Sequence, residues 1–493
     1  MSLTASEIAS AWEGLFQGSL APLGPQVGGH FTAPAVTSTK ASSSVATAKV
    51  TSSALAGNLL SPPASPPASP PPPPPIEGGK LPVLECGPLI FKPLIADTRA
   101  HRERRFYQVL FPDVPDFSPN AGAISPGNKP PTNRIDALSH LRPFIPRYFG
   151  SGRANGIDYI CLENLAFSAT RPAVVDLKVG RIACSPNAST KRKQKELEKY
   201  IWQELIGFRV TGMKSYSSSG EILDADRMYG RTLGPDSVSL AFRHFFRLEE
   251  LYVELAQSGH AELLQSKPGS PLHQALAREL AARWRGTPGH AVGLPPAYPI
   301  PSDVFSATGS GRGPSVLSWS SGLPFCSPPA RGPIEGPVTS KRRTSETLVA
   351  RLLGRLLLLR TAHWQLSNLE RALRLQGAFH IYSSSVLIIY DDAFLDQELP
   401  STRPDDLSIF PPVGLPPSAA TMAGEQLPLP EQMPAWAQHC PVTVRLIDFA
   451  HALDATPAGS PDQSTLYGVG SIMSCVEQLI AEVEILLDHL MHL

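Results

Sequence analysis

Residues 172–180 read PAVVDLKVG, an apolar run that ends in a carboxylate and an ammonium two positions apart. Its aliphatic and β-branched residues predict a strand. Side chains at i and i+2 share one face of a strand, so Asp176 and Lys178 are expected to point into the same cleft. There the carboxylate is able to accept a hydroxyl proton and the ammonium to hold a phosphoryl group. Spacing alone also fits a solvated strand end, which is the commoner arrangement.

Composition limits the classes of protein that the chain can represent. Its 493 residues would fill two or three average domains, but 52 are Pro and 38 are Gly, so the folded part is expected to be smaller. Lys+Arg and Asp+Glu both number 43, so bulk charge does not favour direct nucleic-acid binding. The six Cys residues form no C-x-x-C pair and no metal-ligand spacing with His, which predicts reduced thiols. The N-terminal residues do not fit a secretory signal.

Three segments read as disordered insertions because they are rich in Pro, Gly and Ser and have few regularly spaced apolar positions. They span residues 31–80, 264–340 and 396–438. The first contains a polyproline tract that predicts a stiff spacer or a ligand for SH3- or WW-like domains. Loop-closure entropy grows only with the logarithm of loop length, so the sequence permits pairing of strands across this interruption without establishing it.

The remaining blocks alternate between expected strands and helices. The expected strands lie at 89–91, 144–150, 158–165, 173–180, 208–216 with a return through 228–233, and a hairpin-like pair at 383–392 and 442–450. The expected helices lie at 99–110, 189–204, 238–258, 344–375 and 471–492. The strands come first and most helices later, and the hairpin-like pair is expected to form a second small sheet. This order predicts a two-lobed α+β protein.

The same blocks resemble, in order, those of the inositol polyphosphate kinase family. The matching segments are QVGGH (26–30), GPLIFKP (87–93), RRFYQVL (104–110), FIPRYFG (144–150), YICLENL (159–165), PAVVDLKVG (172–180), IGFRVTGMKSY (206–216), YGRTL (229–233), YSSSVLIIYD (382–391) and RLIDFAH (445–451). The resemblance implies a two-lobed fold like those of protein kinases, ATP-grasp enzymes and SAICAR synthase. It implies one interrupted kinase domain over 1–493, with an N-lobe over 20–165 and a C-lobe over 166–493.

Within the family, DFAH (448–451) and the segments 206–216 and 228–233 resemble the multikinases most. The implied activity is transfer of the γ-phosphoryl group of ATP, with Mg2+, to hydroxyls of inositol tris- and tetrakisphosphate. Two alternatives stay open. One is a hexakisphosphate kinase that forms pyrophosphates, and the other is a non-catalytic kinase-fold scaffold that recruits partners.

The resemblance assigns residues to a nucleotide site. Lys92 corresponds to the Lys that holds ATP phosphates and Glu103 to its acidic partner. Glu163 and Leu165 fall where backbone groups of the hinge read the adenine. Asp448 corresponds to the Mg2+ ligand, since a carboxylate at a strand end is able to bridge the metal to the phosphates.

The resemblance also assigns the reacting pair. Asp176 would orient or deprotonate the attacking hydroxyl and Lys178 would stabilise the transferred group. Ser384 belongs to a Ser-rich strand start that lies near the nucleotide and metal in the family, although a plain strand start has the same composition.

A basic segment follows the strand that carries Asp176. Between Arg171 and Lys214 there are ten Lys or Arg residues and four acidic ones, which predicts a site for a small polyanion. Residues 183–214 are therefore the expected inositol-phosphate-binding region. A solvated helix face or a nuclear localisation signal at 191–195 would give the same pattern.

The resemblance places Arg99, Lys195, Lys199 and His451 against the substrate phosphates. Lys195 and Glu196 stand where the multikinases often carry Gln. The expected partners are inositol polyphosphates, with a phosphoinositide lipid as a further candidate substrate. A monomer in the nucleus and cytoplasm is expected.

Overall fold

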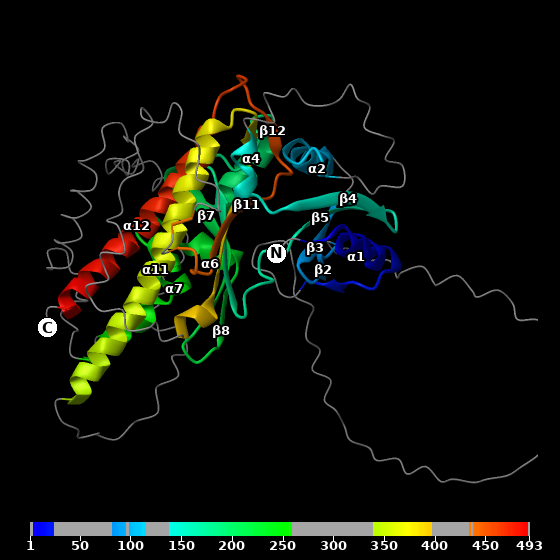
Figure 1. Ribbon diagram of the computed structural model, residues 1–493. Coiled ribbons are helices and arrows are strands. Elements are labelled where there is room, and N and C mark those ends of the chain that lie inside the picture. The colour runs from blue at the N-terminus through cyan, green and yellow to red at the C-terminus, as the bar shows by residue number, and fades with distance from the viewer. Residues whose placement is uncertain are drawn as a thin grey trace, which may run out of the picture.

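The computed structural model describes residues 3–23, 81–94, 98–114, 138–255, 257–258, 339–396, 433–434 and 437–491. The three predicted insertions lie almost entirely outside these residues, and so does the QVGGH segment at 26–30. Two five-stranded antiparallel sheets, flanked by helices, make up the described part (Figure 1). This arrangement confirms the α+β prediction.

The first sheet has the strand order β1-β2-β3-β5-β4. Its strands are β1 (Ala21–Pro22), β2 (Leu84–Cys86), β3 (Leu89–Leu94), β4 (Tyr148–Ala154) and β5 (Ile157–Glu163). Because Ala21 pairs with Glu85, the chain does form strand pairing across the long interruption. Lys92 on β3 pairs with Ile160 on β5, so their side chains share the face that turns toward the second sheet.

A helix that the sequence analysis did not anticipate covers the other face of this sheet. Helix α1 (Ala5–Gln17) begins at a capping box formed by Thr4 and Glu7. The indole of Trp12 meets Phe91 edge to face with ring centroids 4.9 Å apart. A Cβ on Gly152 would lie 2.6 Å from that indole, so only glycine at this position lets α1 pack so closely.

The second sheet has the order β11-β10-β6-β7-β8. Its strands are β6 (Pro172–Val179), β7 (Phe208–Tyr216), β8 (Ile222–Ala225), β10 (Ser385–Asp391) and β11 (Val442–Ile447). The antiparallel pairing of β10 with β11 is confirmed. The prediction that these two strands form a separate small sheet is wrong, because β10 also pairs with β6. The continuous apolar run of β10 suits a central strand. A separate two-stranded sheet is formed instead by β9 (Phe379–Ile381) and β12 (Ala452–Asp454).

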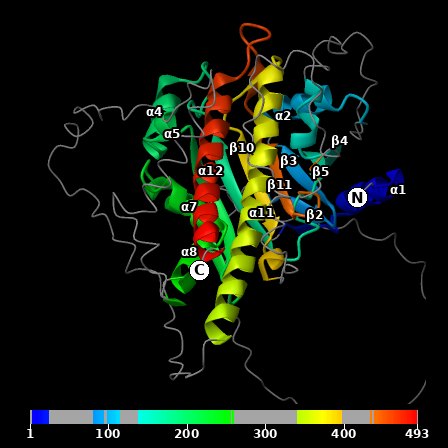
Figure 2. The same cartoon turned by 60° about the vertical axis from the view of Figure 1, so that its left-hand side comes forward.

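Two long helices lie side by side over one face of the second sheet (Figure 2). They are α11 (Thr339–Leu375) and α12 (Gln463–Met491), which begin five and eight residues before their predicted starts at 344 and 471. Alternate residues of the central strands, among them Val175, Leu177 and Ile388, are buried on the side of these helices. The intervening residues therefore face the opposite side, where the cleft lies.

Three predicted elements differ from the structure. Residues 228–233 do not form the return strand, because Asp226 caps a short helix, α6 (Arg227–Thr232), and the return is β8. The helix predicted at 238–258 is two helices, α7 (Val238–Phe245) and α8 (Leu248–Leu255), separated at Arg247, whose φ is 55°. The helix predicted at 189–204 stops at α4 (Thr190–Lys199), since Tyr200 is buried in an extended conformation, and α5 (Gln203–Ile206) follows.

The remaining helical elements are short or lie next to the cleft. Helix α2 (Thr98–Leu110) follows β3, as predicted, and 3-10 turns occupy Arg142–Phe144 and Asp392–Asp396. Within the described ranges no helix has the length and apolar character needed to cross a bilayer. The five cysteines that the structure describes are free thiols, as expected.

Candidate active site

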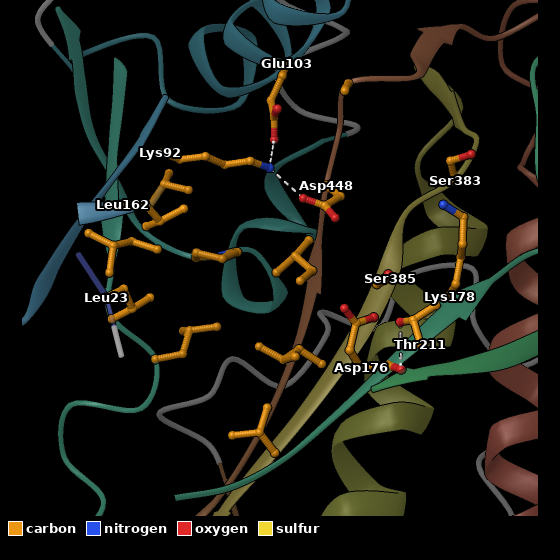
Figure 3. A pocket seen from close by; sticks show the side chains of 18 of the residues that line it. Leu23, Lys92, Glu103, Leu162, Asp176, Lys178, Thr211, Ser383, Ser385 and Asp448 are labelled. Atoms are coloured by element: carbon orange, nitrogen blue, oxygen red, sulfur yellow. Dashed lines mark hydrogen bonds and ion pairs between the residues drawn. The ribbon is translucent and has the colours of Figure 1, made fainter. Parts of the chain in front are cut away.

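A cleft with a volume of about 1050 Å³ is lined by both sheets and by helices α2 and α4. Figure 3 shows its interior, with Lys92, Glu103 and Asp448 facing Asp176 and Lys178 across the space. The sequence assigned these five residues from separate segments, and the structure brings all of them to the same cleft.

One end of the cleft is apolar. Its walls are Leu23, which directly follows β1, Ile90 and Leu162 from the first sheet, and Leu387 and Ile389 from the second. A slot between two apolar sheet faces is suited to a flat aromatic ring.

The predicted hinge residues Glu163 and Leu165 line this apolar end. The Glu163 amide donates to the carbonyl of Arg147 at 2.9 Å, so this amide already takes part in holding the end of β5 to the start of β4. Asn164 fixes the segment, because its side-chain amide donates to Glu85 Oε1 at 2.9 Å and to the Gly87 carbonyl at 3.1 Å.

Lys92 forms two ion pairs at the centre of the cleft. Its Nζ lies 2.7 Å from Glu103 Oε1 and 2.5 Å from Asp448 Oδ1. Burial alone would lower the pKa of this ammonium, but the two carboxylates outweigh burial and raise it. Lys92 is therefore a permanent cation between two acidic groups, able to exchange one of them for a phosphate.

Asp448 directly follows β11 and adopts a left-handed backbone conformation with φ of 67°. Such a conformation is uncommon for a residue other than glycine and persists only where the surroundings enforce it. The next residue supplies that constraint, because Phe449 is fully buried and stacks on Phe106 of α2. Asp448 Oδ1 is thereby held against Lys92.

Asp176 and Lys178 share the cleft face of β6, as predicted. Asp176 is 7% exposed, and its Oδ1 is buried and has no hydrogen-bond partner among the described residues. Burial raises the pKa of Asp176 to about 6, and the negative charge of Asp448 acts in the same direction, while the Thr211 and Ser385 hydroxyls and Lys178 oppose it. A buried carboxylate with a vacant acceptor oxygen and a raised pKa is suited to accept a proton from a bound hydroxyl.

Lys178 lies beside a second cation as well as beside carboxylates. Burial lowers the pKa of its ammonium, and the neighbouring guanidinium of Arg209 lowers it further. Residues paired across an antiparallel sheet share a face, and Lys178 pairs with Arg209 on one side and with Ser385 on the other. The ammonium is thus placed to meet an anion that enters the cleft.

One face of α4 forms a wall of the cleft. Arg192, Glu196 and Lys199 line it because positions i, i+4 and i+7 fall on one side of a helix. Lys199 was predicted to bind substrate and does lie here. Lys195 was also predicted, but it is exposed and is not among the residues that line the cleft; it lies at the edge of this face, three positions after Arg192 and four before Lys199.

His451 and Arg99 both line the basic end of the cleft, as predicted. The His451 Nε2 lies 3.1 Å from Arg192 Nη2. Burial lowers the pKa of His451 to about 4, and the nearby cations, Arg192 and Lys178 first, add to this effect. The imidazole is therefore neutral at physiological pH and able to donate or accept one hydrogen bond within a positively charged region.

The structure adds cleft residues that the sequence analysis did not single out. They are Arg192, Arg209, Lys214, Arg227 and Arg231. A bulge at Thr211 lets both Arg209 and Lys214 reach the cleft face although five positions separate them, because Asp176 pairs with Gly212 while Leu177 pairs with Val210.

The last two arginines come from helix α6. A Cβ on Gly230 would lie 1.8 Å from the Val210 carbonyl, so glycine lets α6 press against β7 and present these arginines. The spacing on α4 was readable from the sequence, whereas the bulge and the close packing of α6 were not.

The predicted role of Ser384 does not fit its position. Its side chain is fully buried and its hydroxyl donates to the Ile381 carbonyl at 3.3 Å. The residues that line the cleft are its neighbours Ser383 and Ser385, because side chains alternate between faces at the strand start.

The donor set around Asp448 is compatible with magnesium. Mg2+ is commonly held by one or two carboxylates together with water and substrate phosphates, rather than by an all-protein cage. No group of three or more His, Cys, Asp or Glu side chains gathers into a metal site in the part of the chain that the structure describes. Asp448 is the carboxylate that would hold such an ion.

Comparison with known proteins gives matches over the segments that build this cleft. A family model described as inositol polyphosphate kinase matches residues 159–266 and 346–477. The inositol polyphosphate multikinase of Homo sapiens is 30% identical over 113 residues, which are 22% of this chain and 27% of that protein. Inositol polyphosphate multikinase alpha of Arabidopsis thaliana is 29% identical over 171 residues, 32% of this chain and 52% of that protein.

Inositol hexakisphosphate kinase 1 of Mus musculus is 30% identical over 122 residues, 23% of this chain and 27% of that protein. The chain therefore spans between about a quarter and about half of the length of these curated relatives. A crystal structure of an inositol phosphate multikinase from S. cerevisiae, in complex with ADP and Mn2+, aligns with a TM-score of 0.36 at 15% identity, over 80% of this chain and 99% of that one.

The two segments that the family model matches carry Asp176 and Lys178 in the first and Asp448 in the second. On this basis, the chain belongs to the inositol polyphosphate kinase family.

Proposed function

We propose that the chain is an ATP- and Mg2+-dependent kinase of the multikinase type, which transfers the γ-phosphoryl group to hydroxyls of inositol tris- and tetrakisphosphate. The observation that carries this proposal is the order of groups along the cleft. An apolar slot comes first, then the Lys92–Glu103–Asp448 ion pairs, then Asp176 with Lys178, and finally the basic wall of α4 and α6.

The nucleotide end uses the residues of both sheets. The apolar slot receives the adenine, with backbone groups near Glu163 and Leu165 beside it. Lys92 binds the phosphates while Glu103 keeps its ammonium in place. Asp448 is the residue that would hold Mg2+, whose charge neutralises the β- and γ-phosphates when it is bound.

The transfer step relies on positioning and charge more than on covalent chemistry. Asp176 accepts the hydrogen bond, and then the proton, of the attacking hydroxyl at its vacant Oδ1. Lys178 lies two residues away on the same face and stabilises the phosphoryl group as it moves. The new phosphoester bond forms as the bond from the γ-phosphorus to the bridging oxygen breaks, and ADP leaves with the freed oxygen.

The basic end argues for a compact polyphosphate acceptor. Arg192, Lys199 and Arg231 line it on elements that surround one small space, unlike the extended positive track that a nucleic acid requires. His451 contributes a neutral hydrogen-bonding group among these cations. Several phosphates on one ring would satisfy this arrangement.

Two other functions remain as alternatives. Similarity to a hexakisphosphate kinase over 122 residues keeps a pyrophosphate-forming activity in view. A scaffold without catalysis is disfavoured because Lys92, Asp176, Lys178 and Asp448 all lie in the cleft. Four further proposals concern the acceptor, the partners, the oligomeric state and the location. They are a phosphoinositide headgroup as a second acceptor, SH3- or WW-like partners for residues 31–80, a monomeric state, and a nuclear and cytoplasmic location.

The test is a product profile by chromatography with Mg-ATP and two acceptors side by side. Phosphorylation of inositol 1,4,5-trisphosphate to tetrakis- and pentakisphosphate supports the multikinase. Products formed only from the hexakisphosphate support the pyrophosphate-forming alternative. No product from either acceptor supports the scaffold.

A further inference from the structure

Arg209 is a buried cation inside the cleft, and not all of its N–H groups have a hydrogen-bond acceptor among the described residues. It is 8% exposed and lies on β7 directly across from Lys178. Its Nη1 is buried without a hydrogen-bond partner among the described residues, and its Nη2 lies 3.8 Å from Glu196 Oε2, beyond hydrogen-bond range. A guanidinium carries five N–H donors, so most of the hydrogen-bonding capacity of Arg209 is unused.

Burial of Arg209 beside Lys178 is costly unless an anion joins them. Burial lowers the pKa of Arg209, and Arg231 adds to this effect while Glu196 opposes it. Lys178 in turn has its pKa lowered by burial and by Arg209, which together outweigh the opposing effect of Asp448, Glu196 and Asp176. Two cations on adjacent strands repel one another in a poorly solvated site, and an anion bound between them would remove both the repulsion and the unmet donors.

Glu196 is the anion that stands nearest to this position. Its Oε1 lies 2.5 Å from Lys199 Nζ and its Oε2 faces Arg209. The carboxylate therefore shares its charge between two cations that both line the cleft. A phosphate group has one more oxygen and more charge than a carboxylate, and it would compete for the same two cations.

We propose that Arg209 is a specificity-determining residue, which binds the substrate phosphate next to the reacting hydroxyl. The carboxylate of Glu196 occupies the position of that phosphate until the substrate enters. This inference rests on the proposed function, because it assumes an inositol polyphosphate as the ligand. It assigns the Arg209–Lys178 pair to the phosphate nearest to Asp176, since Asp176 and Lys178 lie on the same face of β6.

Two substitutions at this position have opposite expected effects. Arg209→Met keeps an unbranched side chain of similar length but removes the donors, so affinity for the polyphosphate should fall roughly tenfold to a hundredfold, the range for losing a hydrogen bond to a charged group. Glu196→Gln removes the competing charge, so affinity should rise severalfold. A gain in affinity is a result that damage to the fold would not produce.

The experiment is calorimetric titration of inositol 1,4,5-trisphosphate, and in a second series of inositol hexakisphosphate, into the full chain without nucleotide. Arg153→Met is the matched control, because Arg153 is exposed on β4 and is not among the residues that line the cleft. Thermal unfolding of each variant tests whether the fold is intact.

Weaker binding by Arg209→Met and tighter binding by Glu196→Gln, with Arg153→Met within twofold of the wild type, would support the inference. Equal binding by Arg209→Met and the wild type would overturn it and leave the proposed function standing. A wild type that binds neither inositol trisphosphate nor hexakisphosphate would overturn both.

Discussion

The ring of Phe449 stacks on the ring of Phe106, with centroids 3.9 Å apart and planes 11° from parallel. Phe449 directly follows Asp448, and Phe106 lies one helical turn after Glu103 on α2. The two carboxylates that hold Lys92 are therefore anchored by one aromatic contact in the core. Any shift of α2 relative to the end of β11 would move both.

Substitution of Phe449 by Leu should reduce nucleotide affinity more than its effect on stability suggests. Loss of the stacked pair should lower the free energy of unfolding by about 1 kcal/mol, the usual worth of such a contact beyond its buried area. Asp448 would then be held less firmly against Lys92. Titration with Mg-ATP should show weaker binding.

Phe246→Leu is the matched control. Phe246 stacks on Tyr390 with ring centroids 5.8 Å apart, and neither residue is among those that line the cleft. It should lose similar stability and retain nucleotide affinity. Equal nucleotide affinity in Phe449→Leu and the wild type would show that the stacked pair does not position Asp448.

Lys92→Met should abolish phosphoryl transfer and also destabilise the protein. Glu103 is 5% exposed at its side chain, so removal of its cationic partner leaves a buried carboxylate uncompensated. The expected loss is about 3 kcal/mol, toward the low end for a broken buried pair because Lys92 is partly exposed. Urea unfolding measures this loss.

The double variant Lys92→Met/Glu103→Leu separates the two effects. Its stability should recover most of the loss, because the buried Glu103 carboxylate is removed and Asp448, the other partner of Lys92, is 32% exposed at its side chain and reaches water. Its activity should stay absent. If the double variant is as unstable as Lys92→Met, the cost does not come from the orphaned Glu103.

The pH dependence of both rate and stability should report Asp176, whose pKa is raised to about 6 by burial and by Asp448. An ionised carboxylate is needed to accept the hydroxyl proton, so kcat/KM should fall about tenfold per pH unit below pH 6 and level off above it. Kinetics across pH 4.5 to 8 measures this limb. A flat profile through pH 6 would remove Asp176 as the base.

The stability of the apo protein should change in the opposite direction. An acid with a raised pKa in the folded state contributes most stability below its unfolded pKa and loses that contribution as pH rises through about 6. Asp176→Asn should therefore be more stable than the wild type at pH 8, by about 3 kcal/mol for a shift near two pKa units, and similar to it at pH 4. Thermal melts at the two pH values test this difference.

Lys195 and Lys199 give a direct comparison of two lysines on one helix. Lys199 lines the cleft and pairs with Glu196, whereas Lys195 is exposed outside it. Lys199→Ala should raise the KM for inositol trisphosphate roughly tenfold, the effect of losing one charge-assisted contact, and Lys195→Ala should change it less than twofold. A larger rise in KM for Lys195→Ala than for Lys199→Ala would mean that α4 turns about its axis when substrate binds.

The sequence predicted the central strands because their signals are local, and the family resemblance pointed to Lys92, Glu103 and Asp448, which the structure gathers in one cleft. The alternation around Asp176 and Lys178 has a period of two, and the structure places both side chains on the cleft face. Ser384 was assigned one position out of step, since the sequence did not show where β10 begins.

What the sequence did not reveal depends on contacts between distant segments. Helix α1 is stabilised by the indole of Trp12 over Gly152, and α6 by the closeness of Gly230 to Val210. The bulge at Thr211, which brings Arg209 next to Lys178, is visible only once β6 and β7 are paired. Residue type and spacing along one segment carry none of this information.

The proposed transfer of the γ-phosphoryl group of ATP to an inositol polyphosphate depends most directly on Asp176 and Lys178. The most direct measurement is transfer of radiolabel from γ-labelled ATP to inositol 1,4,5-trisphosphate by the wild type and by Asp176→Asn, with Mg2+ present. Labelled tetrakisphosphate from the wild type, and at least a hundredfold less from a folded Asp176→Asn that still binds Mg-ATP, is the predicted result. Equal transfer by the two proteins, or none by the wild type, would contradict the claim.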